Sequence, residues 1–338
     1  MVTSGKTCRT YNGFDANGFG QLKDGRGNVC PVTIILPTLA MEVDGDIGHK
    51  NIDDFMKLLD TKIHEAKIEL QERFDWICLQ DPRSASFMYE NGFMYGYDGK
   101  HIRSAMKHGT LAIGQLGLAE TLRILIGKDQ CTDDGMELAK KIEQLFKDRC
   151  AEFKHEIHYD EDNKPYYLNY GVYYTPAENL CYKAMKAFQD KYGKIKNISD
   201  RDFFTNSIHV SVWNKVDPFE KIDIESQLTG YSNAGCITYV ELDDGAKNNL
   251  DAIEQIVNYA MDKDIPYFAI NVPNDTCMNC GYTDEINDKC PICGSDNIMR
   301  LRRVTGYLST DYHRFNKGKQ QEVEMRFKHS NLLKGWKN

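Results

Sequence analysis

The stretch Arg302-Arg303-Val304-Thr305-Gly306-Tyr307-Leu308 lies about thirty residues before the C-terminus and follows a cluster of four cysteines. Its glycine, Gly306, has no side chain, so the backbone there can approach another residue closely. The Cα–H bond of a glycine is also weak, because a radical at that carbon is delocalised onto both flanking amides. A lone Gly-Tyr pair is usually an ordinary turn, so the sequence around it decides which interpretation holds.

The cysteine cluster upstream consists of two CxxC motifs, Cys277-Met278-Asn279-Cys280 and Cys290-Pro291-Ile292-Cys293, separated by nine residues. Gly281 and Gly294 follow the second cysteine of each motif, as tight knuckle turns require. Four thiolates suit a tetrahedral Zn²⁺ ion in a closed structural site, with iron as the alternative. We therefore expect Cys277, Cys280, Cys290 and Cys293 to bind a zinc ion that ties down the loop after them.

Composition excludes several classes of protein. The 338 residues include 41% hydrophobic and 27% charged residues, as in an ordinary soluble globular protein. The net charge of −8 argues against a nucleic-acid partner. A secretion signal and an apolar run of about 20 residues are both missing, so we expect a cytoplasmic protein without membrane spans. The eleven cysteines then indicate reduced thiols or metal ligands, and the scattered ones at 78, 131, 150, 181 and 236 are expected to be buried.

The order of expected elements indicates an α/β fold with largely parallel strands. Strands alternate with helices along the chain, which is typical of βαβ units. We expect strands at 32–36, 208–212, 237–242 and 266–272, a strand leading through glycines into a helix at 109–120, and helices at 52–77, 133–156 and 250–261. Thr175-Pro176-Ala177-Glu178 combines a capping threonine, a first-turn proline and a capping-box glutamate, and predicts a helix from Thr175 to about Tyr192.

Ordered matches along the whole chain carry a family resemblance. The Arg-Val-x-Gly-Tyr pattern around Gly306 resembles the radical-bearing loop of glycyl radical enzymes. Together with the other matches, the chain resembles the C-terminal half of an anaerobic (class III) ribonucleoside-triphosphate reductase. The matching stretches are Cys8-Arg9-Thr10, Val32-Thr33-Ile34-Ile35-Leu36-Pro37, Gly109-Thr110-Leu111-Ala112-Ile113-Gly114, Thr175-Pro176-Ala177-Glu178, Thr205-Asn206-Ser207-Ile208-His209-Val210, the paired CxxC motifs, Arg303-Val304-Thr305-Gly306-Tyr307-Leu308 and Phe315-Asn316-Lys317-Gly318-Lys319.

The resemblance implies a specific architecture. The fold would be the second half of a ten-stranded α/β barrel with a central finger loop, followed by a zinc ribbon and a glycyl radical loop. The expected units are 1–272 for the finger loop and half-barrel, 273–300 for the zinc knuckles, and 301–338 for the radical loop and tail.

The resemblance also implies a reaction, the anaerobic reduction of ribonucleoside triphosphates to deoxyribonucleotides for DNA replication. A radical-SAM activase would create the radical on Gly306, and Gly306 would take hydrogen from Cys8. The Cys8 thiyl would abstract the 3′-hydrogen of the ribose, and formate or a thioredoxin-type dithiol would supply the electrons. Cys30 is the second cysteine candidate, expected in members that a dithiol reduces.

The chain departs from the family pattern because the N-terminal half, with its nucleotide-sensing (ATP-binding) cone and first half-barrel, is not in the sequence. We therefore expect a truncated or split enzyme that needs this half and forms a homodimer. Two alternatives stay open. One is another glycyl radical enzyme, although the adjacent cysteines of the acyltransferases do not occur here. The other is a non-catalytic zinc-ribbon protein.

Overall fold

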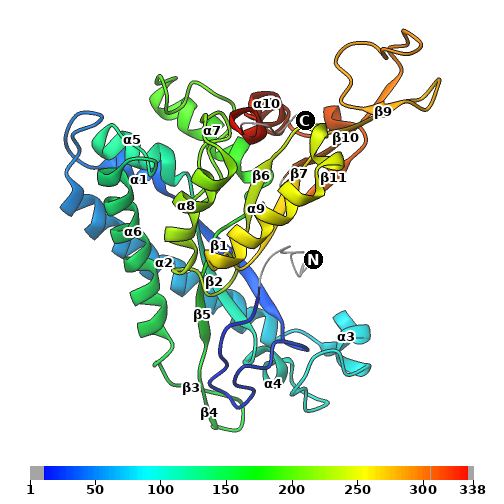
Figure 1. Cartoon of the computed structure of the whole chain (residues 1–338). Coiled ribbons are helices and arrows are strands. Elements are labelled where there is room, and N and C mark those ends of the chain that lie inside the picture. The colour runs from blue at the N-terminus through cyan, green and yellow to red at the C-terminus, as the bar shows by residue number, and fades with distance from the viewer. Residues whose placement is uncertain (1–10, 305, 334–338) are drawn as a thin grey trace.

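Three parallel strands form the centre of the computed structural model, which describes residues 11–304 and 306–333 (Figure 1). They are β1 (Asn28–Ile35), β2 (Thr110–Leu116) and β5 (Asn169–Tyr173), in the order β1-β2-β5. All seven residues of β2 are buried, as expected for the middle strand of a parallel sheet that is covered on both faces. The expected strands at 32–36 and within 109–120 are thus confirmed.

Helices make the crossovers between these strands. The chain from β1 to β2 forms α1 (Leu36–Glu42) and α2 (Ile52–Cys78), and the chain from β2 to β5 forms α5 (Leu118–Ile126) and α6 (Asp133–Phe153). The α2 helix starts where predicted, because the Asn51 side chain accepts a hydrogen bond from the Asp54 amide at 3.1 Å. Its buried face repeats every three or four residues, at Phe55, Leu59, Ile63, Ala66, Leu70, Phe74 and Cys78.

A second parallel pair forms a separate two-stranded sheet. Strand β6 (Thr238–Glu241) pairs with β7 (Phe268–Asn271), and α9 (Leu250–Asp262) crosses between them. The segment before β6 lies beside β5, since the Tyr174 amide donates to Gly235 O and the Ala234 amide to Val172 O, both at 3.0 Å. Helix α8 (Pro218–Thr229) packs on β6 and α9.

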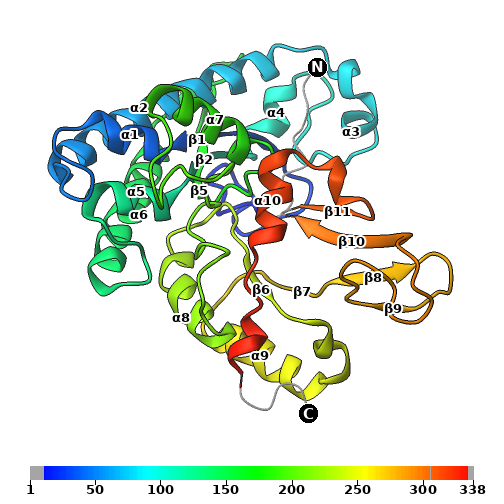
Figure 2. The same cartoon turned by 90° about the horizontal axis from the view of Figure 1, so that it is seen from above.

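A third, antiparallel sheet lies at one end of the molecule. Its strands are β8 (Asn274–Cys277), β9 (Thr283–Asp284), β10 (Ile298–Val304) and β11 (Tyr307–Ser309), in the order β11-β10-β8-β9. The part around β8 and β9 projects away from the helices, whereas α10 (Lys317–Met325) returns to pack against α7 (Leu180–Tyr192) and β10 (Figure 2).

The remaining elements are short. They are the helices α3 (Ser86–Glu90) and α4 (Ile102–Met106), the strands β3 (His158–Tyr159) and β4 (Pro165–Tyr166), and 3₁₀ turns at Pro82–Ala85, Asp244–Asn248, Tyr312–Arg314 and His329–Leu332. Within the described residues, no helix combines the length and the apolar character needed to cross a bilayer.

The predicted start of the helix at Thr175 is wrong, because α7 begins at Leu180 after Asn179. The Thr175 hydroxyl bonds instead to the Thr33 hydroxyl of β1 at 2.9 Å, and the Thr175 carbonyl accepts from the Ser207 hydroxyl at 3.0 Å. These tertiary bonds hold Thr175 at the end of β5, so the capping pattern does not act there.

The predicted strand at 208–212 is also wrong, since this segment is irregular. Several of its backbone groups bond to side chains, and none pairs with a described strand. The Val210 amide donates to the buried Glu225 carboxylate at 3.0 Å, and the Gln130 amide group donates to the carbonyls of Ile208 and His209.

The scattered cysteines are buried at Cys78, Cys150, Cys181 and Cys236, as expected. Cys131 is the exception: it is exposed, because it lies in the loop between α5 and α6.

Candidate functional site

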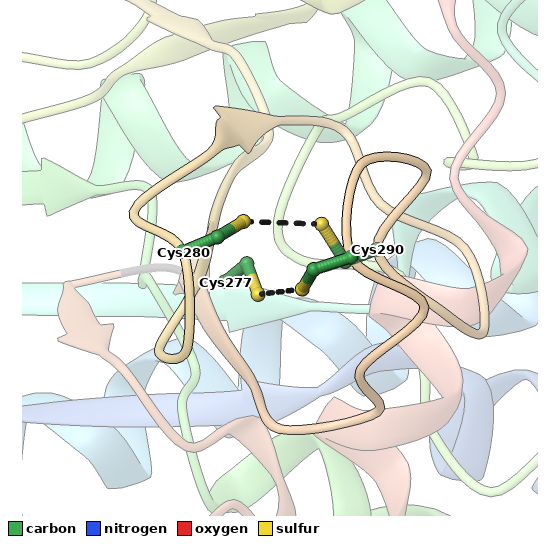
Figure 3. A group of neighbouring side chains, drawn as sticks. Cys277, Cys280 and Cys290 are labelled. Atoms are coloured by element: carbon green, nitrogen blue, oxygen red, sulfur yellow. Dashed lines mark hydrogen bonds between the residues drawn. The ribbon is translucent and has the colours of Figure 1, made fainter.

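The four cysteines of the paired CxxC motifs converge on one point (Figure 3). Their sulfur atoms all lie within 4.8 Å of one another, and the Cys277–Cys293 and Cys280–Cys290 sulfurs are each 3.5 Å apart. Four sulfurs bound to zinc at about 2.3 Å would stand about 3.8 Å apart at the corners of a tetrahedron. The observed spacing fits such an ion, so the cluster can hold a metal.

Two equivalent turns shape the cluster. In each turn a glycine amide donates to the carbonyl of the first cysteine at 2.9 Å, Gly281 to Cys277 and Gly294 to Cys290. Both glycines have left-handed backbone angles, with φ of +77° and +71°, which favour glycine over residues with a side chain. Gly281 and Gly294 therefore shape the turns that bring the cysteines together.

The electrostatics of the cluster also favour a cation. The Cys280 backbone amide lowers the pKa of the Cys277 thiol to about 6, which favours a thiolate there. The Tyr282 amide favours a thiolate at Cys280 too, but desolvation and the neighbouring sulfurs outweigh it and raise that pKa to about 12. A divalent cation removes this conflict, because it stabilises all four thiolates at once.

Strand β10 connects the cysteine cluster to Gly306. Ile298, its first residue, pairs with Cys277, and Val304, its last, pairs with Tyr307 on β11. At about 3.3 Å per residue the seven residues of β10 span roughly 20 Å. A metal in the cluster would therefore lie too far from Gly306 to contact it directly.

Gly306 lies in the turn of the hairpin formed by β10 and β11, which we call the Gly306 hairpin (residues 298–309). The glycine is half-buried. Cys8 lies outside the described residues. Cys30 belongs to β1, where the register with β2 shifts between Val29 and Val32, an irregularity typical of a bulge. The structure thus describes the backbone at Cys30 and Gly306 but not Cys8.

A groove of about 710 Å³ runs beside this hairpin, and we call it the hairpin groove. The hairpin contributes one wall, and the ends of β6 and β7, the side of α10 and the loop after β9 contribute the others. Charged side chains of both signs line it: Arg300, Arg302, Arg303, Arg326 and Lys328 against Glu241, Glu285, Asp288 and Glu324.

Sequence reasoning missed Asp275, which anchors β10 from the neighbouring strand β8. Its side chain is fully buried and accepts hydrogen bonds from Arg302 (3.0 Å to one oxygen) and Arg300 (3.3 Å). The Ile286 amide donates to the same carboxylate at 3.1 Å. The alternation of arginines at 300 and 302 was the signal, since alternate residues of a strand face the same side.

A second group missed by the sequence lies where the parallel strands end. Thr33 of β1 and Thr175 after β5 meet over Gly114 of β2. A methyl group on Gly114 would stand 2.0 Å from the Thr175 hydroxyl oxygen, so only glycine fits between them. In open parallel sheets ligands bind at this carboxyl edge of the strands.

The loop that follows Cys8 in the chain is fixed by Asp15. Its buried carboxylate accepts from the His108 ring at 2.8 Å, from the Asn169 side chain at 2.9 Å and from the Phe19 amide at 3.0 Å. Burial opposes ionisation of Asp15, but these hydrogen bonds outweigh it and lower the pKa well below the usual range. Phe19 stacks on His108 at 3.9 Å between ring centroids.

Comparison of the sequence with known proteins identifies one family. The family model described as anaerobic ribonucleoside-triphosphate reductase matches residues 2–329. The chain is 32% identical over 342 residues to the anaerobic ribonucleoside-triphosphate reductase of Escherichia coli (strain K12), covering 95% of this chain and 45% of that protein. It is 32% identical over 338 residues to the enzyme of the same name from Enterobacteria phage T4, covering 52% of that protein.

Solved structures share the fold. An anaerobic ribonucleotide reductase structure superposes with a TM-score of 0.67 at 19% identity, covering 91% of this chain and 46% of that one. The Thermotoga maritima anaerobic ribonucleotide reductase with glycerol in the active site gives a TM-score of 0.63 at 17% identity, covering 97% and 48%. The chain thus spans about half the length of the curated relatives that it matches. Since the family model covers nearly the whole chain, the protein belongs to the anaerobic ribonucleoside-triphosphate reductase family.

Proposed function

We propose that this chain provides the C-terminal part of an anaerobic reductase that converts ribonucleoside triphosphates to 2′-deoxyribonucleoside triphosphates by radical chemistry. The observation that carries the proposal is the position of Gly306 in a hairpin turn, between a strand that starts at the cysteine cluster and a strand beside the hairpin groove. A glycine in such a turn can reach toward another residue without a side chain in the way.

In this proposal Gly306 stores the radical and Cys8 uses it. A radical-SAM activating enzyme removes one hydrogen atom from Gly306, and the glycyl radical then takes the hydrogen of the Cys8 thiol. The Cys8 thiyl abstracts the 3′-hydrogen of the ribose, and the 2′-hydroxyl leaves as water. The network around Asp15 supports this role for Cys8, because it fixes the loop that begins within ten residues of the thiol.

The two electrons for the reduction come from formate or from a thioredoxin-type dithiol. Cys30 is the residue of this chain that would take part in dithiol reduction. The irregular pairing of β1 with β2 next to Cys30 supports this role, because bulges are over-represented next to active sites. Replacement of Cys30 by serine separates the two routes, because only the dithiol route needs its sulfur.

The cysteine cluster would hold one zinc ion through Cys277, Cys280, Cys290 and Cys293. Four protein sulfurs leave no open position for a reacting group, so the ion is structural. Its contribution is to fix the start of β10 and, through this strand, the Gly306 hairpin.

We further propose that the described sheets form a half-barrel that is completed by the residues corresponding to the other half of the relatives. Within residues 11–304 and 306–333, β1 pairs only with β2 and β7 only with β6, so each has an edge free for another strand. The open hairpin groove would then become part of a closed interior. The complete enzyme would act as a homodimer, with nucleotide sensing in the other half.

Reconstitution tests this function. The 338-residue chain is co-expressed with a polypeptide that supplies the remaining half of the family sequence, activated anaerobically, and assayed with each ribonucleoside triphosphate. We expect a stable complex that makes deoxyribonucleotides, and no turnover from the 338-residue chain alone. Turnover by this chain alone would contradict the need for the second half, and an inactive but stable, radical-bearing complex would contradict the substrate class.

A further inference from the structure

A buried guanidinium joins the Gly306 hairpin to the body of the protein. Arg326 follows α10, and only 12% of its side chain is exposed. Its Nη1 donates to the backbone carbonyl of Arg303 at 2.7 Å. Its Nη2 donates to Glu322 of α10 at 3.2 Å, and its Nε lies 3.5 Å from Glu241 of β6. One side chain therefore ties together β10, α10 and β6.

The guanidinium keeps its charge in this position. Burial opposes the charged form, but the fields of Glu241 and Glu322 outweigh it and raise the pKa of Arg326. Glu322 is itself held ionised, because Lys319 and Arg326 outweigh the effect of burial and lower its pKa. Removing Arg326 would therefore leave Glu241 and Glu322 as buried carboxylates without this cation, which is costly.

The bonded carbonyl has a special place in the chain. Arg303 is three residues before Gly306 and one residue before the end of β10. Arg326 and Glu241 also line both the hairpin groove and a second, small cavity of about 40 Å³. The guanidinium thus forms part of the wall against which the end of β10 rests.

We propose that Arg326 is a positioning residue for the radical glycine, which it serves by holding the Arg303 carbonyl at a fixed place relative to β6 and α10. The inference rests on the proposed function of Gly306 as the radical site. Hydrogen transfer between Gly306 and a thiol needs near-contact geometry, and a displacement of about 1 Å costs roughly 100-fold in rate. The planar, forked guanidinium bonds a carbonyl and one carboxylate while it faces a second carboxylate, which the single ammonium of a lysine cannot do with the same geometry.

The test compares Arg326→Met with a matched control, Lys319→Met. Lys319 is also buried and also pairs with Glu322, at 2.6 Å, but it makes no bond to the Arg303 carbonyl. Backbone hydrogen exchange of the 298–309 peptides is measured in the zinc-loaded 338-residue chain before activation. Radical yield and turnover are then measured in the activated complex with the second half. Arg326→Lys serves as the conservative variant.

In Arg326→Met we expect the backbone amides at the end of β10 and in β11 to exchange at least tenfold faster than in wild type, with unchanged zinc content. Turnover should fall by about 10- to 100-fold. Lys319→Met should leave exchange in the hairpin unchanged, and Arg326→Lys should fall between wild type and Arg326→Met. Equal effects of Arg326→Met and Lys319→Met would overturn the inference, as would wild-type exchange in Arg326→Met. A wild-type complex without a radical would overturn the proposed function alone, because the exchange comparison still decides whether Arg326 holds the hairpin.

Discussion

Asp275 accepts two hydrogen bonds from the guanidinium of Arg302, which stands four residues before Gly306. The two residues lie on neighbouring strands, and the carboxylate is fully buried. Strand β10 runs from the cysteine cluster to the Gly306 turn. The pair therefore anchors the middle of the strand that connects the two.

Asp275→Asn therefore tests the anchor. Loss of the charge leaves two arginines without their buried partner, and we expect the free energy of unfolding to fall by about 3–5 kcal/mol. Chemical denaturation of the zinc-loaded chain measures this change. Asp288→Asn, an exposed acid in the same groove, is the control and should change stability by less than about 0.5 kcal/mol. Equal stability of the two variants would show that the Asp275 pairs contribute nothing to the fold.

Cys290→Ser tests the metal site. Anaerobically purified wild-type chain should contain about one zinc per chain, and the variant should lose it, because three thiolates and a hydroxyl form a much weaker tetrahedral site. Metal analysis by mass spectrometry gives the count. We also expect the radical yield at Gly306 to fall, since the start of β10 loses its anchor at Cys277. Cys131→Ser changes an exposed cysteine outside the cluster and should keep both metal and radical. A metal-free variant with a normal radical yield would separate the cluster from Gly306.

Gly114→Ala tests the carboxyl edge of the central sheet. The added methyl group would stand 2.0 Å from the Thr175 hydroxyl and 3.0 Å from the Tyr173 carbonyl, so Thr175 must move away from Thr33. Overpacking of this kind costs about 1–3 kcal/mol, and we expect weaker binding of ribonucleoside triphosphate to the reconstituted complex. Gly230→Ala is the matched control, because its methyl group meets nothing within 4 Å. Unchanged stability and nucleotide affinity in Gly114→Ala would remove this edge from the candidate site.

The buried carboxyl of Glu143 should make the stability of the protein depend on pH. Burial raises the pKa of this fully buried carboxyl to about 8, against the weaker effects of Tyr174 and Gln115. The folded state therefore keeps a proton that the unfolded state releases above pH 4.5, so this group's contribution to stability falls as pH rises from about 4.5 to 8. Glu143→Gln keeps a neutral side chain of the same shape and should remove the loss, on the order of 4 kcal/mol at pH 8.

Denaturation curves at pH 5, 6, 7 and 8 measure this difference. His329 affects both proteins equally, because burial lowers its pKa to about 3 and both should lose the same stability below pH 6.5. The difference between the two proteins therefore isolates the effect of Glu143. Parallel pH profiles of wild type and Glu143→Gln would show that Glu143 is ionised in the folded protein.

Local patterns predicted the parts of the fold that local forces determine. The apolar spacing of 52–77 predicted α2, because the buried residues of this helix lie on one face. Asn51 was predicted as a candidate cap, and its side chain accepts the capping hydrogen bond. The cysteine knuckles were predictable for a similar reason: the two cysteines and the glycine of each turn lie within five residues.

Other features depend on residues that are distant in the chain. Thr175 has the sequence of a helix cap, but its hydroxyl bonds to Thr33, 142 residues away. The pair of Arg326 with the Arg303 carbonyl has no spacing pattern that marks it, because one partner is a backbone group. The roles of Cys8, Cys30 and Gly306 came from resemblance to a family rather than from any pattern of burial or spacing, and they stay predictions.

The assignment of the radical pair is the central claim, and paired substitutions test it. Gly306→Ala should abolish the stored radical, because the added methyl group crowds the turn and disfavours a planar radical centre. Cys8→Ser should keep the radical but abolish turnover, because an O–H bond is too strong for a glycyl radical to break. Gly318, another glycine near the C-terminus, packs within α10, where a methyl group would meet the Asp202 carbonyl at 2.6 Å.

The most direct measurement is electron paramagnetic resonance of the anaerobically activated complex, followed by mass analysis of the chain after exposure to air. We predict a glycyl radical signal in wild type and Cys8→Ser but not in Gly306→Ala. Oxygen should then cleave the chain at Gly306 and release a C-terminal peptide of about thirty residues. A signal retained in Gly306→Ala, or cleavage at Gly318 instead, would contradict the account.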